Sequence, residues 1–172
     1  MVATYWDPAK TSSFSSKLTS FQCFSSWHHR NDKSGNADIT GWYQGAPNRL
    51  LANVIDGYTC KHSSGFDYYS DIGLGWLQID LKGIYTLKCV RVPVRSEQVF
   101  FTTYFKGIEF RFGNESRNGN YKLNPIIGLS EDESFEQMVE FCPNYQLVGR
   151  YMIMQKVFSD KLIIPEVQIT VQ

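Results

Sequence analysis

The sequence predicts an all-β protein, an antiparallel β-sandwich of the jelly-roll type with few short helices. Three observations carry this prediction: apolar and polar residues alternate in several segments, glycines punctuate those segments, and helical periodicity is almost absent. Alternation with a period of two is typical of strands that bury one face. Several such strands without crossover helices favour an antiparallel sandwich.

The expected elements follow one another along the chain. Residues 11–26 are rich in Ser and Thr with Phe interspersed, and residues 27–38 are polar. Residues 1–44 are therefore expected to be an N-terminal extension that packs on or wraps the domain 45–172. A short helix is expected over 47–55, with proline near its start and glycine after its end. Strands are expected over 76–81, 87–95, 107–113 and 165–172, with Gly83 among the turn residues; Pro93 and Pro165 indicate edge strands or bulges.

Composition excludes several classes of protein. A chain of 172 residues that is 42% hydrophobic can bury one full core. Seventeen basic against 17 acidic residues leave no net charge, which argues against a dedicated nucleic-acid binder. No apolar run is long enough for a membrane helix, and residues 1–10 lack the core of a signal peptide, so an intracellular protein and a mature segment both remain open.

Eight short motifs occur in a fixed order from residue 53 onward. They are NVIDG (53–57), CKHSSG (60–65), WLQIDL (76–81), IYTLKCVRV (84–92), FKGIEFRFGN (105–114), FCP (141–143), VGRYMIM (148–154) and PEVQI (165–169). Together they resemble the discoidin or coagulation-factor C-type domain, a galactose-binding-like jelly roll, and above all the fucolectins, which are fucose-binding lectins. The resemblance covers residues 45–172 and implies an extracellular carbohydrate-binding module.

The resemblance implies a calcium ion held between the NVIDG turn and the last strand. Its candidate ligands are Asn53, Asp56, Thr59 and Glu166, with the backbone carbonyls of Tyr58 and Pro165. Calcium prefers six to eight hard oxygen ligands, and this set supplies such oxygens. The alternative is that Asp56 and Glu166 hydrogen-bond backbone amides in turns.

The resemblance also implies a sugar site at the loop end of the jelly roll. His62 matches the family's histidine, Arg95 its first arginine, and the second basic position falls near Tyr104, with Lys106 two residues on. The alternative is a loop histidine and a solvated strand-end charge. Aromatic residues gather in two connections at the same end, 66–75 and 98–105, where they either form a contact surface or pack onto the sandwich.

The four cysteines depart from the family pattern. Cys60 and Cys142 match half-cystines of the family whose partner positions hold other residues here. Either new pairs form, for instance Cys23 with Cys60 or Cys142, or all four including Cys89 are free thiols. The loss of both partners favours a protein with few disulfides.

Catalysis is not expected, because the sequence contains no GxSxG, HExxH or P-loop motif and no locally paired carboxylates. The leading hypothesis is a lectin-like module that binds glycans or glycoproteins, with calcium as a possible cofactor and homo-oligomerisation as a possibility. The alternative is a structural, assembly or protein-binding jelly roll that has lost its sugar site.

Overall fold

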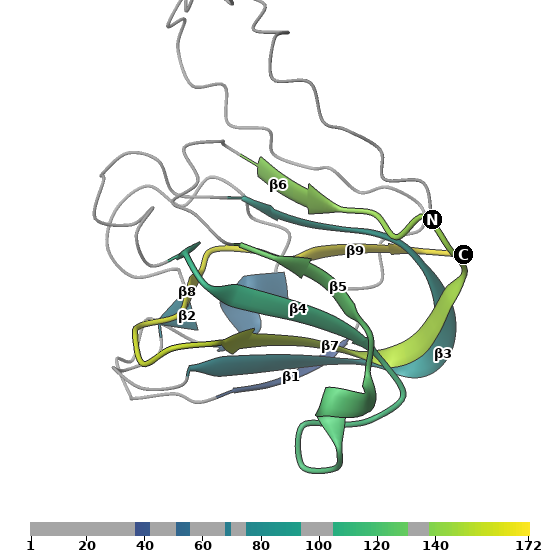
Figure 1. Ribbon diagram of the computed structural model, residues 1–172, viewed down its shortest axis with the longest axis horizontal. Helices are drawn as coiled ribbons and strands as arrows, with labels where there is room; N and C mark the ends of the chain where they lie inside the picture. Colours follow the sequence, from purple (N-terminus) through teal and green to yellow (C-terminus); the bar gives the residue numbers. More distant parts are fainter. Residues whose placement is uncertain (1–36, 42–50, 56–67, 70–74, 94–104, 131–137) are drawn as a thin grey trace, which may run out of the picture.

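The computed structural model describes residues 37–41, 51–55, 68–69, 75–93, 105–130 and 138–172 (Figure 1). The strands of this part are β1 (Asp38–Gly41), β2 (Tyr68–Tyr69), β3 (Trp76–Pro93), β4 (Ile108–Gly113), β5 (Ile126–Leu129), β6 (Met138–Phe141), β7 (Leu147–Lys156), β8 (Ile163–Ile164) and β9 (Gln168–Val171). Two 3-10 helices, η2 (Leu51–Ile55) and η3 (Tyr121–Leu123), complete it. All the pairings between these strands are antiparallel, which confirms the predicted all-β class.

The long strand β3 belongs to both layers of the sandwich. Its first half pairs with β1 and β7, and its second half pairs with β9 and β6. Where the two halves of β3 meet, its pairing register with β7 shifts between Asp80 and Tyr85, and Lys82 has a φ of 63°. Figure 1 shows the strand curving round one end of the molecule at this point. Gly83 therefore lies inside a continuous bent strand, and the expectation of a turn between two strands there is wrong.

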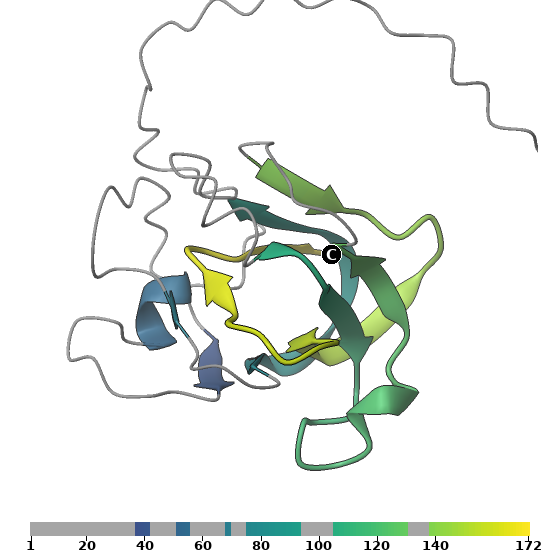
Figure 2. The ribbon, with the colours of Figure 1, turned by 60° about the vertical axis from the view of Figure 1, so that its left-hand side comes forward.

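Figure 2 shows the strands wrapping round the interior of the sandwich. The buried hydrophobic side chains form one core cluster there. The predicted alternation is confirmed over residues 76–81 of β3 and in β4, since every second side chain there is buried. The buried members of these two alternating runs are Leu77, Ile79, Leu81, Ile108, Phe110 and Phe112. Phe110 lies 4.8 Å from the ring of Phe141 on β6, so the two layers meet through aromatic contacts. Burial of these side chains out of water is the main term that stabilises the sandwich.

Three sequence-based expectations need correction. The described part of the expected helix 47–55 is the 3-10 helix η2. Pro165 lies between β8 and β9 and belongs to neither strand, because a residue without an N–H group cannot extend the ladder. The last run is not half exposed: Glu166 and Gln168 are buried as well as Val167, whose N donates a hydrogen bond to Val54 O of η2.

A disulfide joins Cys89 of β3 to Cys142, directly after β6. This pair was not among the pairings expected, and the alternative of four free thiols is wrong. The reason is positional: Val90 of β3 pairs with Phe141 of β6, so the residues beside them are neighbours in space. Cys23 and Cys60 lie outside the described residues. Residues 38–41, which fall in the segment assigned to the N-terminal extension, form β1 and pair with β3.

Candidate functional site at the loop end

One end of the sandwich holds the described strand ends next to which, along the chain, the predicted ligand-binding segments lie. β3 both begins and ends there, β7 ends there and β4 begins there, as Figure 1 shows on its left-hand side. Backbone hydrogen bonds tie these segments together: Lys156 N donates to Gly75 O at 2.9 Å, and Val157 N donates to Gly107 O at 3.0 Å. We call this the loop end, and the opposite end, where β3 bends, the far end.

The structure describes some of the predicted site residues and not others. Lys106, Pro165 and Glu166 lie in the described part, together with the backbone of Asn53 in η2. The remaining candidates lie outside the described residues: Asp56, Tyr58, Thr59, His62, Arg95 and Tyr104.

The described residues of the predicted calcium site come from two neighbouring segments, η2 and the segment just before β9. Val167 N donates a hydrogen bond of 2.7 Å to Val54 O, which joins the residue after Glu166 to the residue after Asn53. Glu166 itself is completely buried. Burying a carboxylate is costly unless a cation or hydrogen bonds compensate its charge. Glu166 offers a buried carboxylate near η2, and Asp56 follows η2 directly along the chain. Carboxylate oxygens of this kind suit a hard cation such as calcium.

Lys106 lies in the turn before β4, and neighbouring residues hold the backbone of this turn in place. The ring of Phe105 is buried in the core, 6.3 Å from Phe110. Ser130 holds the turn from the other side: its Oγ donates to Phe105 O at 2.5 Å, and Ile108 N donates to the same Oγ at 2.8 Å. Of the expected aromatic surface 98–105, Phe105 therefore packs into the sandwich, while 98–104 lie outside the described residues.

Gly107 closes this turn in a way that only glycine permits. Its φ is +67°, in the left-handed region, and a Cβ atom there would overlap the ring of Phe158. The ring of Phe158 thus packs directly on the backbone of the turn. The position of Lys106 is fixed by its neighbours on both sides.

Lys156, at the end of β7, is a buried cation under the same turn. Its Nζ donates to Lys106 O, lies 3.7 Å from Asp160 Oδ2, and sits 4.9 Å from the centre of the Phe158 ring. Burial lowers the pKa of Lys156 to about 8, while Asp160 partly opposes that shift. The ammonium group therefore holds the turn from inside, at the cost of its own hydration.

Sequence reasoning missed Lys156 and Ser130. The sequence contains a signal for Lys156: the residue continues the alternation of Met152 and Met154, at a position where an apolar residue is expected. It contains none for Ser130, since a serine after a short strand has many possible roles.

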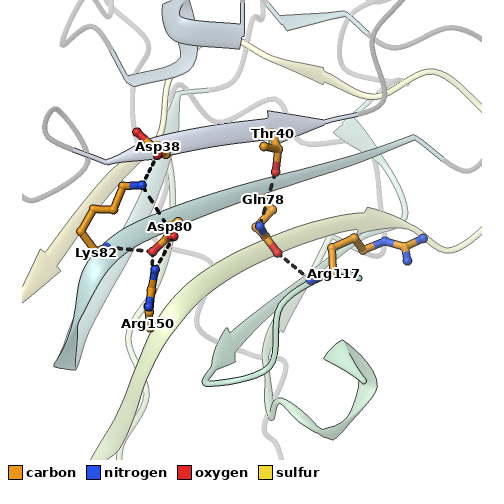
Figure 3. Close-up of polar contacts among 7 residues, drawn as sticks. All are labelled: Asp38, Thr40, Gln78, Asp80, Lys82, Arg117 and Arg150. Atoms are coloured by element: carbon orange, nitrogen blue, oxygen red, sulfur yellow. Dashed lines mark hydrogen bonds and ion pairs between the residues drawn. The ribbon is translucent and has the colours of Figure 1, made fainter. Parts of the chain in front are cut away.

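A second set of polar residues lies on the surface of β1, β3 and β7, and Figure 3 shows it in detail. This surface polar cluster consists of Asp38, Thr40, Gln78, Asp80, Lys82, Arg117 and Arg150. Arg150 binds Asp80 with two hydrogen bonds, Nε to Oδ1 at 2.7 Å and Nη2 to Oδ2 at 2.8 Å. Lys82 N adds a third at 2.8 Å, and its Nζ pairs with Asp38.

The charges of this cluster compensate one another. The hydrogen bond from Arg150 is the main reason that the pKa of Asp80 lies below its ordinary value. Asp80 belongs to the WLQIDL motif and Arg150 to the VGRYMIM motif, 70 residues apart. Two of the motifs that carry the family resemblance therefore meet in a structural ion pair.

The connection between β4 and β5 covers the neighbouring surface. Arg117 N donates to Gln78 Oε1 at 2.5 Å, and its guanidinium lies over the rings of Trp76 and Tyr121, at 5.2 and 4.5 Å. Ile153 of β7, which points away from the core, is completely buried. This part of the surface thus has a packed layer of its own.

An open cavity of about 740 Å³ lies beside the disulfide, lined among others by Thr86, Lys88 and Tyr145. It is at the far end, and none of the predicted site residues in the described part of the chain lines it. Among the described residues Cys89, Glu140 and Cys142 lie close enough to share a metal, but the disulfide occupies both sulfurs. No helix in the described part is long and apolar enough to cross a membrane.

Comparison with known proteins identifies the fold. No protein-family model matches the chain, and no curated protein does. Among solved structures it is similar to an F-lectin (fucolectin) from striped bass (Morone saxatilis) serum, with a TM-score of 0.71 and 20% identity over 82% of this chain. The chain spans 49% of the length of that lectin.

Two single modules show the same similarity. A fucose-binding module of Streptococcus pneumoniae has a TM-score of 0.66 at 15% identity, covering 82% of this chain and 95% of the module. The lectin domain of lectinolysin, solved with Lewis b antigen, has a TM-score of 0.64 at 12% identity, covering 81% and 96%. The chain therefore has the discoidin-like, galactose-binding-like β-sandwich fold of fucolectins and carbohydrate-binding modules, as its motifs predicted.

Proposed function

We propose that the chain is a non-catalytic carbohydrate-binding module that holds its ligand at the loop end. The most direct support is that several predicted sugar contacts lie within or next to described residues along the chain. Arg95 follows two residues after the end of β3, and Tyr104 immediately precedes the buried Phe105. Lys106 stands on the rigid turn itself. Along the chain, Arg95 and Tyr104 are thus within two residues of described positions at one end of the sandwich.

The chemistry of these side chains suits a saccharide. The guanidinium of Arg95, the ammonium of Lys106 and the imidazole of His62 donate hydrogen bonds to sugar hydroxyl groups and the ring oxygen. Tyr104 offers a ring face for the apolar side of the sugar. Anchored donors lose little conformational entropy on binding, which favours a site built next to rigid turns.

The solved structures of this fold add support for the ligand class. They include a fucose-binding module, a lectin domain with Lewis b antigen, and a Clostridium perfringens module with GalNAc-β-1,3-galactose. Since identity to them is 10–20%, we propose recognition of glycans or glycoproteins and leave the sugar to experiment. The disulfide fits an extracellular protein, because such bonds persist in oxidising compartments.

We also propose a calcium ion beside the sugar site. Glu166 and the carbonyl of Pro165 would hold it from one side, and Asn53, Asp56, Thr59 and the carbonyl of Tyr58 from the other. The ion would supply a fixed positive charge that ties η2 to the start of β9. Its role is to hold the loops that carry His62, and it takes no part in chemistry.

A glycan array tests the proposal, run on the full chain with Ca²⁺ and with a chelator. We expect a defined set of glycans to bind, and His62→Ala and Arg95→Ala each to weaken binding by about tenfold or more, since each removes a hydrogen bond to the sugar. Thr40→Ala, on the surface polar cluster, is the matched control and should bind normally. No glycan signal from folded protein, together with concentration-dependent self-association, would support the assembly role instead.

The calcium proposal has a separate test. The melting temperature of wild type should rise with Ca²⁺ relative to chelator, and that rise should vanish in Glu166→Gln. Equal melting temperatures of wild type in both conditions would contradict a calcium site.

A further inference from the structure

We propose that Asn114 is an acceptor for an N-linked oligosaccharide when the chain is made in a secretory pathway. Asn114, Glu115 and Ser116 form the Asn-x-Ser triplet that such modification requires, and it is the sequence's only Asn-x-Ser/Thr triplet without an intervening proline. The inference does not depend on the proposed sugar site. It concerns the far end of the sandwich.

Asn114 stands where the chain leaves the sheet. β4 ends at Gly113, which is buried, and Asn114 directly after it is exposed in a bend. Gly113 lies so close to Asn124 that a Cβ atom on it would overlap the Asn124 side chain. The backbone before the acceptor is therefore packed tightly, while the acceptor itself faces solvent. Within the described residues the side chain of Asn114 makes no hydrogen bond, so its amide nitrogen is available.

The residues after the acceptor are held in place independently of it. Glu115 N donates to Asn124 Oδ1 at 3.0 Å, and Asn124 Nδ2 donates to Glu115 O at 2.7 Å. Gly119 N donates to Ser116 O at 3.0 Å. A substituent on Asn114 breaks none of these bonds. The folded protein can therefore carry a bulky group at this position without rearrangement.

The modification itself is a glycosyl transfer without oxidation or reduction. The side-chain nitrogen of Asn114 forms a bond to the first carbon of the sugar, and the bond from that carbon to a polyprenyl pyrophosphate carrier breaks. The carrier leaves as the pyrophosphate, and the amide nitrogen gives up one proton. The hydroxyl of Ser116 is the group by which the transferring enzyme recognises the triplet.

The disulfide gives a second, independent observation. Cys89 and Cys142 pair in a fold of moderate size, and such bonds form in oxidising compartments. N-linked transfer takes place in the same compartments. A disulfide and an exposed acceptor triplet on one chain therefore point to the same cellular route.

The position of Asn114 separates this glycan from the loop end. β4 begins at the loop end with Ile108 and ends at the far end with Gly113 (Figure 1). An oligosaccharide on Asn114 therefore projects away from the turn that carries Lys106. We expect it to leave binding at the loop end unchanged.

The test is secretion of the full chain, behind an added signal peptide, from cultured animal cells. We expect the secreted protein to lose mass when peptide-N-glycosidase removes the glycan, with conversion of Asn114 to Asp in its peptide. Asn114→Gln and Ser116→Ala should abolish this shift. Ser116→Thr and Asn120→Gln should keep it, because Thr also completes a triplet and Asn120 is an exposed residue of the same loop outside any triplet.

Secreted wild-type protein with its disulfide formed and Asn114 unmodified would overturn the proposal. If Asn114→Gln is not secreted, the same comparison on Ser116→Ala and Ser116→Thr in cell lysates decides the question. The result is independent of the glycan array, since either test can fail while the other succeeds.

Discussion

The surface polar cluster and the loop end both hold charged side chains, but they hold them differently. In the cluster, Asp80 and Arg150 meet at 2.7 and 2.8 Å and remain partly hydrated. At the loop end, Lys156 has no exposed side-chain surface and its carboxylate partner is 3.7 Å away, and Glu166 is completely buried. Oppositely charged pairs at the surface keep most of their hydration, so forming them costs little desolvation free energy. Burying a charge removes its hydration, and buried charges occur where other groups must be positioned. We infer that the cluster supports the sheet and the loop end supports a site.

The largest expected effect comes from removing the anchor of the Lys106 turn. Phe105→Ala should lower the free energy of unfolding by about 3–5 kcal/mol, because it empties a buried aromatic site. Chemical denaturation measures this loss. Phe105→Leu keeps most of the volume and should cost less than half as much. Equal losses in both variants would contradict a packing role for the ring.

Because of Lys156, the free energy of unfolding should change with pH in the alkaline range. Its pKa is about 8 in the folded protein and near 10.5 when unfolded, so between these values the unfolded chain binds more protons. The free energy of unfolding contributed by this group therefore rises with pH over that window, by up to about 1.4 kcal/mol per pH unit. Lys156→Met should lose this contribution, so its stability relative to wild type should fall as the pH is raised from 7 to 10. A constant difference would show that Lys156 is not held as described.

Asp80→Asn should have a smaller effect, of about 1–2 kcal/mol, since a charged hydrogen bond is weakened and no cavity forms. The depressed pKa of Asp80 adds stability above its unfolded pKa and loses it as the pH falls through the acidic range. The variant should therefore differ most from wild type at neutral pH. An Asp80→Asn protein whose deficit persists unchanged at pH 2 would argue against the ion pair.

Asp38→Asn should have the smallest effect of these variants on the free energy of unfolding. The pair between Asp38 and Lys82 is exposed on both sides, so its loss should cost less than about 1 kcal/mol and less still in high salt. Thermal melts at two salt concentrations measure this. A cost as large as that of Asp80→Asn would mean that the cluster is more cooperative than its geometry indicates.

The sequence was sufficient for the fold because strand periodicity is local. The alternation of Leu77, Ile79 and Leu81 shows directly which side chains face the core. The bend of β3 could not be predicted in this way, because Gly83 is typical of a turn between two strands. The structure keeps Gly83 within one strand, next to Lys82 in the left-handed region. The pairing of Cys89 with Cys142 depends on strand register, which spacing along the chain does not reveal.

The candidate site was predictable only as a set of positions. The resemblance placed Glu166 near the NVIDG turn, and the hydrogen bond between Val167 and Val54 joins those two segments. It could not reveal the buried support of the turn by Lys156 and Ser130, because these contacts arise from three separate strands meeting at one end. The motifs therefore indicated which segments to compare, and the supporting contacts became visible only in the structure.

Two arginines give the most direct test of the difference between these regions. Calorimetric titration with a glycan from the array should be compared for Arg95→Met and Arg150→Met, at a temperature where both proteins are folded. We predict that Arg95→Met loses affinity with an unchanged melting temperature, and that Arg150→Met melts earlier with an unchanged dissociation constant. The opposite pattern, with affinity lost in Arg150→Met and kept in Arg95→Met, would contradict the assignment of binding to the loop end.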